Sequence, residues 1–299
     1  MKTNCLKNNW LSGLVLGALL FLNSQPATAA DKLKALIVDG QNNHKWQVTT
    51  PLLQSALESS GRFTVDVATS PRQGQSMENF KPDFAKYNVV VLNYNGDNWP
   101  ATTMSAFENY VRKGGGVAVV HAADNAFTHW VEFNKMIGVG GWGGRNQNSG
   151  SMIRWRDGKQ VLEVGESGGR GTHGKYFSWD VEMRDLKHPI TKGLPAKWLH
   201  TRDELYSKLA GPAENVTVLA TANSDTTQQN EPILMVIRYG KGRVFHTTMG
   251  HDAESIKDVG FVTTLDRGAE WAATGRVTIP VPANFPTADK VSVWTPPAK

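Results

Sequence analysis

Short runs of apolar residues that end in turn-forming residues constrain the fold of this chain more than any other feature. A continuous apolar run is typical of a strand buried on both faces, as in a parallel sheet covered by helices. The predicted strands are residues 34–40, 63–68, 88–94 and 116–121, and the predicted helices are residues 51–59 and 104–112. This β-α-β-β-α-β order predicts an α/β fold with a doubly wound, mostly parallel sheet.

A glycine-rich stretch, residues 138–185, interrupts this pattern. It contains two strand-like runs, residues 152–155 and 161–164, and we interpret it as an inserted β element with loops. The sheet is predicted to resume with strands at residues 216–220, 232–238 and 243–246, and a last helix is predicted over residues 258–273. The Gly240-Lys241-Gly242 segment predicts a hairpin turn between the last two strands.

The first 30 residues have the pattern of a secretory signal peptide. Lys2 and Lys7 precede an apolar run at residues 11–22, and small residues at 26–30 suit a cleavage site. An uncleaved anchor is the alternative, but the apolar run is short for a membrane span. We therefore expect a periplasmic or secreted protein without stable membrane insertion, with a signal peptide at 1–30, an α/β domain at 31–275 and a Pro-rich tail, extended or disordered, at 276–299.

Composition excludes several classes of function. The only cysteine of the sequence, Cys5, lies in the predicted signal peptide, so a cysteine nucleophile, an iron–sulfur cluster and Cys-ligated zinc are excluded from the mature chain. The 32 basic residues, less two in the signal peptide, against 27 acidic ones leave a formal charge of +3. This charge is too small and too dispersed for a nucleic-acid partner.

Three histidines stand at or after the ends of predicted strands. His44 follows the first strand, His121 ends the strand at 116–121, and His251 follows the strand at 243–246. Because ligands of open α/β sheets bind outside the carboxyl ends of the strands, we expect these imidazoles to meet in one pocket. The alternative for His44 is a plain polar turn, and the alternative for His121 is a hydrogen-bonded core histidine.

Other residues are candidates for the same pocket. Asp203 and Glu204 are adjacent, and neighbours in an extended chain face opposite ways, so only one faces the site, for which we choose Glu204; a solvated acidic pair is the alternative. His173 lies between glycines in a loop that could close over a ligand, and tryptophan rings bind the apolar faces of sugars. We predict His121, His251 and Glu204 as catalytic residues, and His44, Trp46, Asp124, Trp142, Arg145 and His173 as substrate-binding residues.

The histidines and Glu204 allow two kinds of chemistry. His44, His121 and His251 with Glu204 could hold zinc or another divalent ion. The chain has no HExxH or closely spaced His-x-His motif to support a metal site. Without a metal, a set of histidine and glutamate suits acid–base work on a sugar carbon or a carbonyl.

Several of these segments together resemble the ThuA-like, or trehalose utilisation, family. They are the loop through His44, the strand from Gly114 to His121, residues 188–190, residues 203–206, and the segment from Gly240 to His251. The resemblance implies a fold similar to flavodoxin and to class I glutamine amidotransferases. By the spacing of strand and turn, His121 stands where an amidotransferase has its cysteine, so glutamine hydrolysis through a thiol is excluded.

The resemblance implies a role in carbohydrate metabolism, often beside enzymes that oxidise sugars at carbon 3. We therefore expect a small-molecule carbohydrate as partner and a sugar or 3-keto-glycoside as substrate of a hydrolase, lyase or isomerase. The alternative is a carbohydrate-binding protein without turnover. An amide or ester hydrolase is disfavoured because neither Ser149 nor Ser167 lies in a Gly-x-Ser-x-Gly turn.

Overall fold

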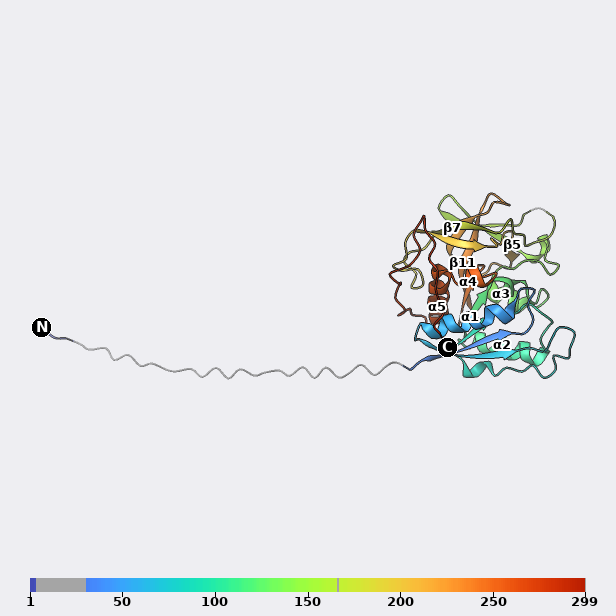
Figure 1. Ribbon diagram of the computed structural model, residues 1–299, viewed down its shortest axis with the longest axis horizontal. Coiled ribbons are helices and arrows are strands. Elements are labelled where there is room, and N and C mark those ends of the chain that lie inside the picture. Colours follow the sequence, from blue (N-terminus) through green and yellow to red (C-terminus); the bar gives the residue numbers. More distant parts are fainter. Residues whose placement is uncertain (4–30, 166, 299) are drawn as a thin grey trace. The chain divides into compact units, whose positions relative to one another are not determined.

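A large mixed sheet forms the centre of the protein (Figure 1). The structure is a computed structural model that describes residues 1–3, 31–165 and 167–298; the predicted signal peptide, apart from residues 1–3, lies outside them. In space the strands of this sheet are β2 (Phe63–Thr69), β1 (Leu33–Asp39), β3 (Val89–Leu92), β4 (Gly116–Val120), β12 (Gly242–Thr247), β11 (Asn230–Tyr239), β10 (Val216–Asn223), β7 (Phe177–Met183) and β8 (Lys197–Asp203).

The sheet has a parallel half and an antiparallel half. Strands β2, β1, β3, β4 and β12 pair in parallel, whereas β12, β11, β10, β7 and β8 pair antiparallel. The sequence-based expectation of a mostly parallel sheet therefore holds for one half only. The cause is the predicted turn at Gly240 and Lys241, which pairs Tyr239 with Gly242. A connection this short allows only antiparallel neighbours.

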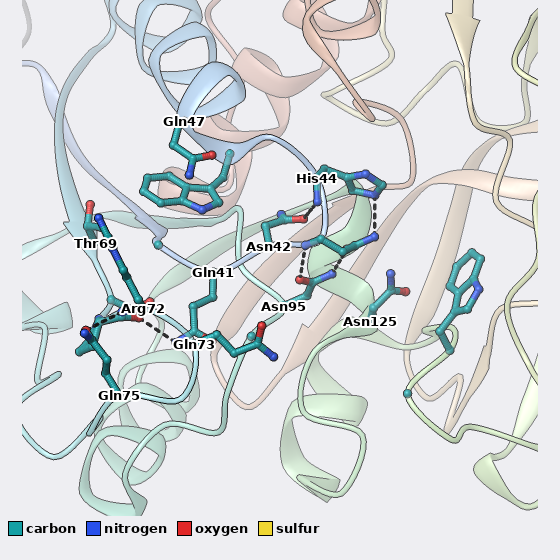
Figure 2. Close-up of a pocket in the computed structure, with 18 of the residues that line it drawn as sticks. Gln41, Asn42, His44, Gln47, Thr69, Arg72, Gln73, Gln75, Asn95 and Asn125 are labelled. Atoms are coloured by element: carbon teal, nitrogen blue, oxygen red, sulfur yellow. Dashed lines mark hydrogen bonds between the residues drawn. The ribbon is translucent and has the colours of Figure 1, made fainter.

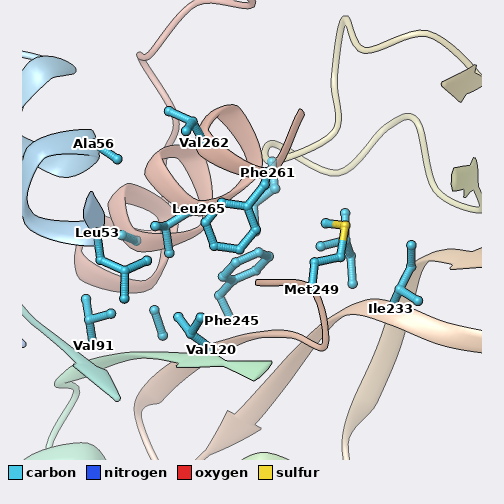
Figure 3. Packing of buried hydrophobic residues seen from close by; sticks show 14 of the residues in the cluster. Leu53, Ala56, Val91, Val120, Ile233, Phe245, Met249, Phe261, Val262 and Leu265 are labelled. Carbon is cyan, nitrogen blue, oxygen red and sulfur yellow. The ribbon is translucent and has the colours of Figure 1, made fainter. Parts of the chain in front are cut away.

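Two long helices cover one face of the parallel half. They are α1 (Trp46–Ser59) and α5 (Val259–Thr274). Figure 3 shows their apolar side chains, among them Leu53 and Leu265, on strand residues such as Val120 and Phe245, and all four are at most 1 % exposed. The neighbouring helix α4 (Ala253–Ile256) is a single short turn.

The opposite face carries α2 (Ala101–Arg112) and α3 (Val131–Ile137). Phe107 and Phe133 of these helices belong to a second buried cluster with Val90 and Val119 of the strands. Because β3 and β4 are apolar on both faces, each helical layer has a strand surface to cover. Short 3-10 turns complete the described helical segments at Phe84–Lys86, His121–Asn125 and Gln147–Ser149.

The glycine-rich stretch is divided between two sheets. Strands β5 (Ser151–Arg156) and β6 (Lys159–Glu163) join β9 (Ala210–Gly211) in a small antiparallel sheet. The remainder of the stretch includes β7, which belongs to the large sheet. The predicted insertion therefore ends before Phe177. Every second residue of β7 is buried, from Trp179 to Met183. This alternation of buried and less buried residues spans only a short segment, and no strand was predicted there from the sequence.

The segment that follows α5 packs along the protein surface. Val277, Ile279 and Phe285 contact the core cluster of α1 and α5. Leu199 of β8 donates a backbone hydrogen bond to Thr287, and Trp294 donates one to Lys257. These residues of the proline-rich segment thus pack against the core and hydrogen-bond to it. Within the described residues, no helix is both long and apolar enough to cross a membrane.

Replacing Phe245 tests the importance of the core between β12 and α5. The side chain is 0 % exposed and lies directly beside Gly268 of α5. We expect Phe245→Ala to lower the free energy of unfolding by about 3 to 5 kcal/mol, through lost burial and the cavity left behind. Urea unfolding followed by circular dichroism measures this change. Val131→Ala, at a position 61 % exposed, is the control; an equal loss in both variants would contradict the assignment.

Candidate functional site

Loops at one edge of the large sheet bring three imidazole rings together. His44 follows β1, His121 follows β4, and His251 follows β12. The ring centroids of His44 lie 4.9 Å from His121 and 4.5 Å from His251, and those of His121 and His251 are 5.6 Å apart. The carboxyl ends of parallel strands β1, β4 and β12 point to the same edge, which explains the convergence of residues so distant in the sequence.

Glu204 stands at the centre of these histidines. Its Oε2 lies 3.5 Å from Nε2 of His121, and its Oε1 lies 3.4 Å from Nε2 of His251 and 3.7 Å from Nε2 of His173. Burial opposes ionisation of Glu204, but the hydrogen bond and charge of His121 hold the pKa of its carboxyl below the ordinary value. Glu204 is therefore a carboxylate surrounded by imidazole nitrogens. We name Glu204, His44, His121 and His251 the His/Glu cluster.

His121 occupies a strained backbone position. Its φ of +46° lies in the left-handed region, at the sharp change from β4 to the following 3-10 turn. Its Nδ1 is 2.6 Å from the carbonyl oxygen of Thr248. Because a carbonyl oxygen can only accept, Nδ1 carries the proton and donates a hydrogen bond to this oxygen. Nε2 then points toward Glu204. Burial disfavours the charged ring, but Glu204 and Asp203 raise the pKa of His121 above its ordinary value.

Asp203 holds two members of the His/Glu cluster in place. This fully buried carboxylate accepts hydrogen bonds from the backbone N–H groups of Glu204 at 2.8 Å, Gly250 at 2.8 Å and His251 at 3.2 Å. Of the adjacent pair, Glu204 therefore faces the cleft and Asp203 lies beneath it. Despite burial, contact with His200 lowers the pKa of Asp203. The carboxylate joins the end of β8 to the loop after β12.

His44 is a neutral member of the His/Glu cluster. Burial, followed by the neighbouring His121 and His251, lowers its pKa to about 3. Its Nε2 lies 3.3 Å from the hydroxyl of Tyr206, and its backbone N–H donates to Asn42 at 2.9 Å. Helix α1 begins two residues later, at Trp46, so the helix starts earlier than the predicted Pro51. An imidazole that stays neutral keeps a lone pair for a ligand.

A cleft of about 1070 Å³ opens beside the His/Glu cluster. Of the cluster, His44 and Glu204 line it, together with Tyr206, whereas His121 and His251 lie behind them. Figure 2 shows the opposite part of the cleft, where amide side chains and Arg72 from the loops after β1, β2 and β3 face the same space. The amide-bearing residues of the lining are Gln41, Asn42, Asn43, Gln47, Gln73, Gln75, Asn95 and Asn125.

The other predicted binding residues divide into two groups. Trp46, Trp142 and His173 line the cleft. Arg145 and Asp124 do not: each is at most 3 % exposed. The Arg145 guanidinium donates to the carbonyls of Ala126 and Gly141, both at 2.8 Å, and thereby holds the loop that carries Trp142. Asp124 lies 3.3 Å from Nε2 of His246, in the interior of the sheet.

Several residues of the site were not identified from the sequence. They are Tyr206, His200, Arg72 and most of the cleft amides. Tyr206 follows Glu204 at a spacing of two, which places it on the same side of an extended chain and could have signalled its role. The hydroxyl stays protonated because burial raises its pKa well above the ordinary value. The sequence did not indicate that the amide side chains line a cleft, because such residues are also common in ordinary turns.

Three residues of the His/Glu cluster could hold a metal ion. One ligand atom each from His44, Glu204 and His251 can be chosen so that all lie within 4.8 Å of one another. Imidazole nitrogens with one carboxylate are the donor set of zinc and of similar first-row ions. The geometry thus supports both a proton-transfer site and a metal centre.

The structure is that of an α/β protein with a His/Glu cluster at the wall of a polar cleft. The chain belongs to the ThuA family: the family model, described as trehalose utilisation, matches residues 34–272. The match covers both halves of the large sheet and all members of the His/Glu cluster. Membership relates the chain to trehalose utilisation. No curated protein matches the chain.

Solved structures agree with this membership. A ThuA-like protein from Parabacteroides merdae is 47% identical, with 88% of this chain and 98% of that chain covered and a TM-score of 0.85. A ThuA-like protein from Bacteroides uniformis is 21% identical, with 85% and 97% covered and a TM-score of 0.55. The second likeness shows the fold alone.

His200 makes the stability of this region dependent on pH. Burial opposes its charge, but Asp258 and Asp203 outweigh burial and raise its pKa to about 9. A group whose pKa is higher in the folded than in the unfolded state stabilises the folded protein. Its contribution is complete below the pKa of the unfolded state, which is near 6.5 for histidine. This contribution is lost as the pH rises through about 9.

We therefore expect wild-type protein to lose more stability between pH 6.5 and 9 than His200→Asn loses over the same range. Urea unfolding at a series of pH values measures both slopes. His188→Asn, which removes a half-buried imidazole elsewhere, controls for a general histidine effect. Equal slopes for wild type and His200→Asn would mean that His200 is not charged in the folded protein.

Proposed function

We propose that this member of the ThuA family is an enzyme that acts on a keto-sugar, in particular a 3-keto-glycoside, by His/Glu acid–base chemistry. The observation that carries the proposal is the setting of Glu204. Its carboxylate faces the cleft and has the Nε2 atoms of His121, His173 and His251 within 3.4 to 3.7 Å. Such pairs of titratable groups at the wall of a polar cleft are typical of proton-transfer sites.

The lining of the cleft supports a carbohydrate as substrate. Amide groups can both donate to and accept from sugar hydroxyls, and the rings of Trp46 and Trp142 offer apolar surfaces. Some amides are held in place by the protein. Gln41 donates to the carbonyl of Pro71 at 2.8 Å, and its oxygen accepts from the N–H of Asp97 at 2.7 Å. Polar groups that are already oriented lose less entropy when a ligand binds.

His173 is the proton acceptor in this proposal. Its Nδ1 lies 3.1 Å from the carbonyl of Gly174, an acceptor, so Nδ1 is the protonated nitrogen and Nε2 is the basic one. Nε2 is 3.7 Å from Oε1 of Glu204. The side chain is 40% exposed and lines the cleft, where substrate can reach it.

The ketone of the substrate makes the reaction feasible. The carbonyl acidifies the C–H at carbon 2, and transfer of that proton to Nε2 of His173 leaves the electron pair of the C–H bond on the ketone oxygen. The hydroxyl of Tyr206, 3.3 Å from His44, is a donor for this oxygen. Return of the proton at another carbon gives an isomer. Alternatively, re-formation of the ketone breaks the bond from carbon 1 to the glycosidic oxygen, which takes up a proton.

We place this chemistry outside the cytoplasm. The proposal is supported by the charge, the apolar run and the small residues of the first 30 residues. Export would leave a chain shortened by 29 or 30 residues, which mass spectrometry of the native protein can detect.

Replacing His173 tests the proposed reaction. Wild-type protein is incubated with trehalose, other glucosides and the 3-keto form of each, and products are followed by chromatography. We expect turnover of 3-keto forms, and we expect His173→Ala to lower kcat by about 100-fold or more with a smaller change in KM. His129→Ala, at an exposed histidine outside the cleft, is the matched control.

Two outcomes would contradict the proposal. Unchanged kcat in a folded His173→Ala protein would remove His173 from the reaction. Binding of sugars by wild-type protein without any product would favour the alternative, a carbohydrate-binding protein that lacks turnover. Unfolding midpoints of both variants separate a loss of catalysis from a loss of structure.

A further inference from the structure

We propose that the His/Glu cluster binds a divalent transition-metal cation, with His44, Glu204 and His251 as ligands and His121 completing the set. The ligand atoms of the first three lie within 4.8 Å of one another, as expected for groups around one ion. An ion with bonds of about 2.0 to 2.2 Å to nitrogen and oxygen places its ligands about 3 to 4 Å apart. The distances of 3.4 and 3.5 Å from Glu204 to the Nε2 atoms of His251 and His121 fall in this range.

A buried nitrogen of His121 faces the proposed ion position. Its Nδ1 donates a hydrogen bond to the carbonyl of Thr248, so Nε2 is the ring atom that remains for a ligand. Nε2 is buried and has no hydrogen-bond partner among the described residues, in a side chain 3% exposed. It faces a carboxylate oxygen of Glu204 at 3.5 Å. A cation bound between Nε2 and this carboxylate would contact both groups.

The surrounding hydrogen bonds are those of a metal centre. A metal-binding histidine commonly donates its other ring N–H to a carbonyl or carboxylate, as His121 does to Thr248. Asp203 binds the backbone N–H groups of both Glu204 and His251, which fixes the spacing of two ligands from different loops. Gly250 permits the turn before His251: its φ is +108°, and a Cβ there would lie 2.8 Å from Phe261.

The candidate centre is open to the cleft on one side. His44 and Glu204 line the cleft, so an ion that they hold could also bind a substrate oxygen. Three or four protein ligands with an open position are typical of catalytic rather than structural ions. The donor chemistry of several imidazoles with one carboxylate favours Zn²⁺ over Mn²⁺, Mg²⁺ or Ca²⁺.

The role of the ion rests on the proposed function, although its binding does not. In the reaction described above, the ion would polarise the ketone oxygen as a Lewis acid. Glu204 would then be a ligand of the ion, and His173 would be the residue that accepts the substrate proton. The competing occupant of the cluster is a proton shared by His121 and Glu204, and the experiment must separate these two.

Metal binding is measured with the full protein and without any sugar. Protein treated with a chelator and then dialysed is titrated with ZnCl₂ and, separately, MnCl₂ by isothermal titration calorimetry. We expect saturable binding of one ion per chain. Glu204→Gln and His251→Ala should each raise the dissociation constant of the ion by ~10-fold or more. His129→Ala should bind as wild type does, since His129 is exposed and outside the cluster.

A crystal of the zinc-treated protein provides a second readout that does not depend on how the variants fold. An anomalous peak at the zinc edge, between the side chains of His44, Glu204 and His251, is the expected result. Absence of saturable binding, equal affinity in Glu204→Gln and wild type, or a peak located elsewhere would each overturn the proposal. Because no substrate is present, these results are independent of whether 3-keto-glycosides are turned over.

Discussion

The buried carboxylate of Asp203 is the interaction on which the site depends. It accepts backbone hydrogen bonds from Glu204 and His251, which lie on loops after β8 and β12, and it contacts His200 at 2.9 Å. A buried charge is tolerated only where it is paired and fully hydrogen-bonded, so this arrangement has little freedom to shift. The carboxylate therefore determines where Glu204 and the imidazole of His251 lie relative to each other.

The strands that sequence patterns predicted are mostly continuous apolar runs, and they include β10, β11 and β12 as well as the other strands of the parallel half. Strands β1, β3 and β4 and helices α2 and α5 lie within a few residues of their predicted positions, because a strand buried on both faces leaves a continuous apolar run. Strands β7 and β8 were missed since each exposes one side and mixes polar residues into a short segment. The position of β7 in the large sheet depends on pairing with β10, which no local pattern records.

The site was predictable to the extent that strand ends predict it. His44, His121 and His251 follow parallel strands, and the common direction of these strands implies that the rings meet. Glu204 enters from the antiparallel half. The sequence made it a candidate for the same pocket, but its position between the imidazoles depends on the tertiary structure. The interior positions of Arg145 and Asp124 could not be inferred either, because a charged side chain in a glycine-rich or strand-end loop usually lies at the surface.

The four loops that form the His/Glu cluster are widely spaced along the chain, and this spacing has a consequence for biogenesis. During synthesis the segment with His251 leaves the ribosome long after the segment with His44. Contacts between such distant segments form late, because closing long loops costs entropy before the contacts are made. A nascent or half-folded chain thus cannot assemble the complete ligand pocket, and a functional pocket marks a molecule whose maturation is finished.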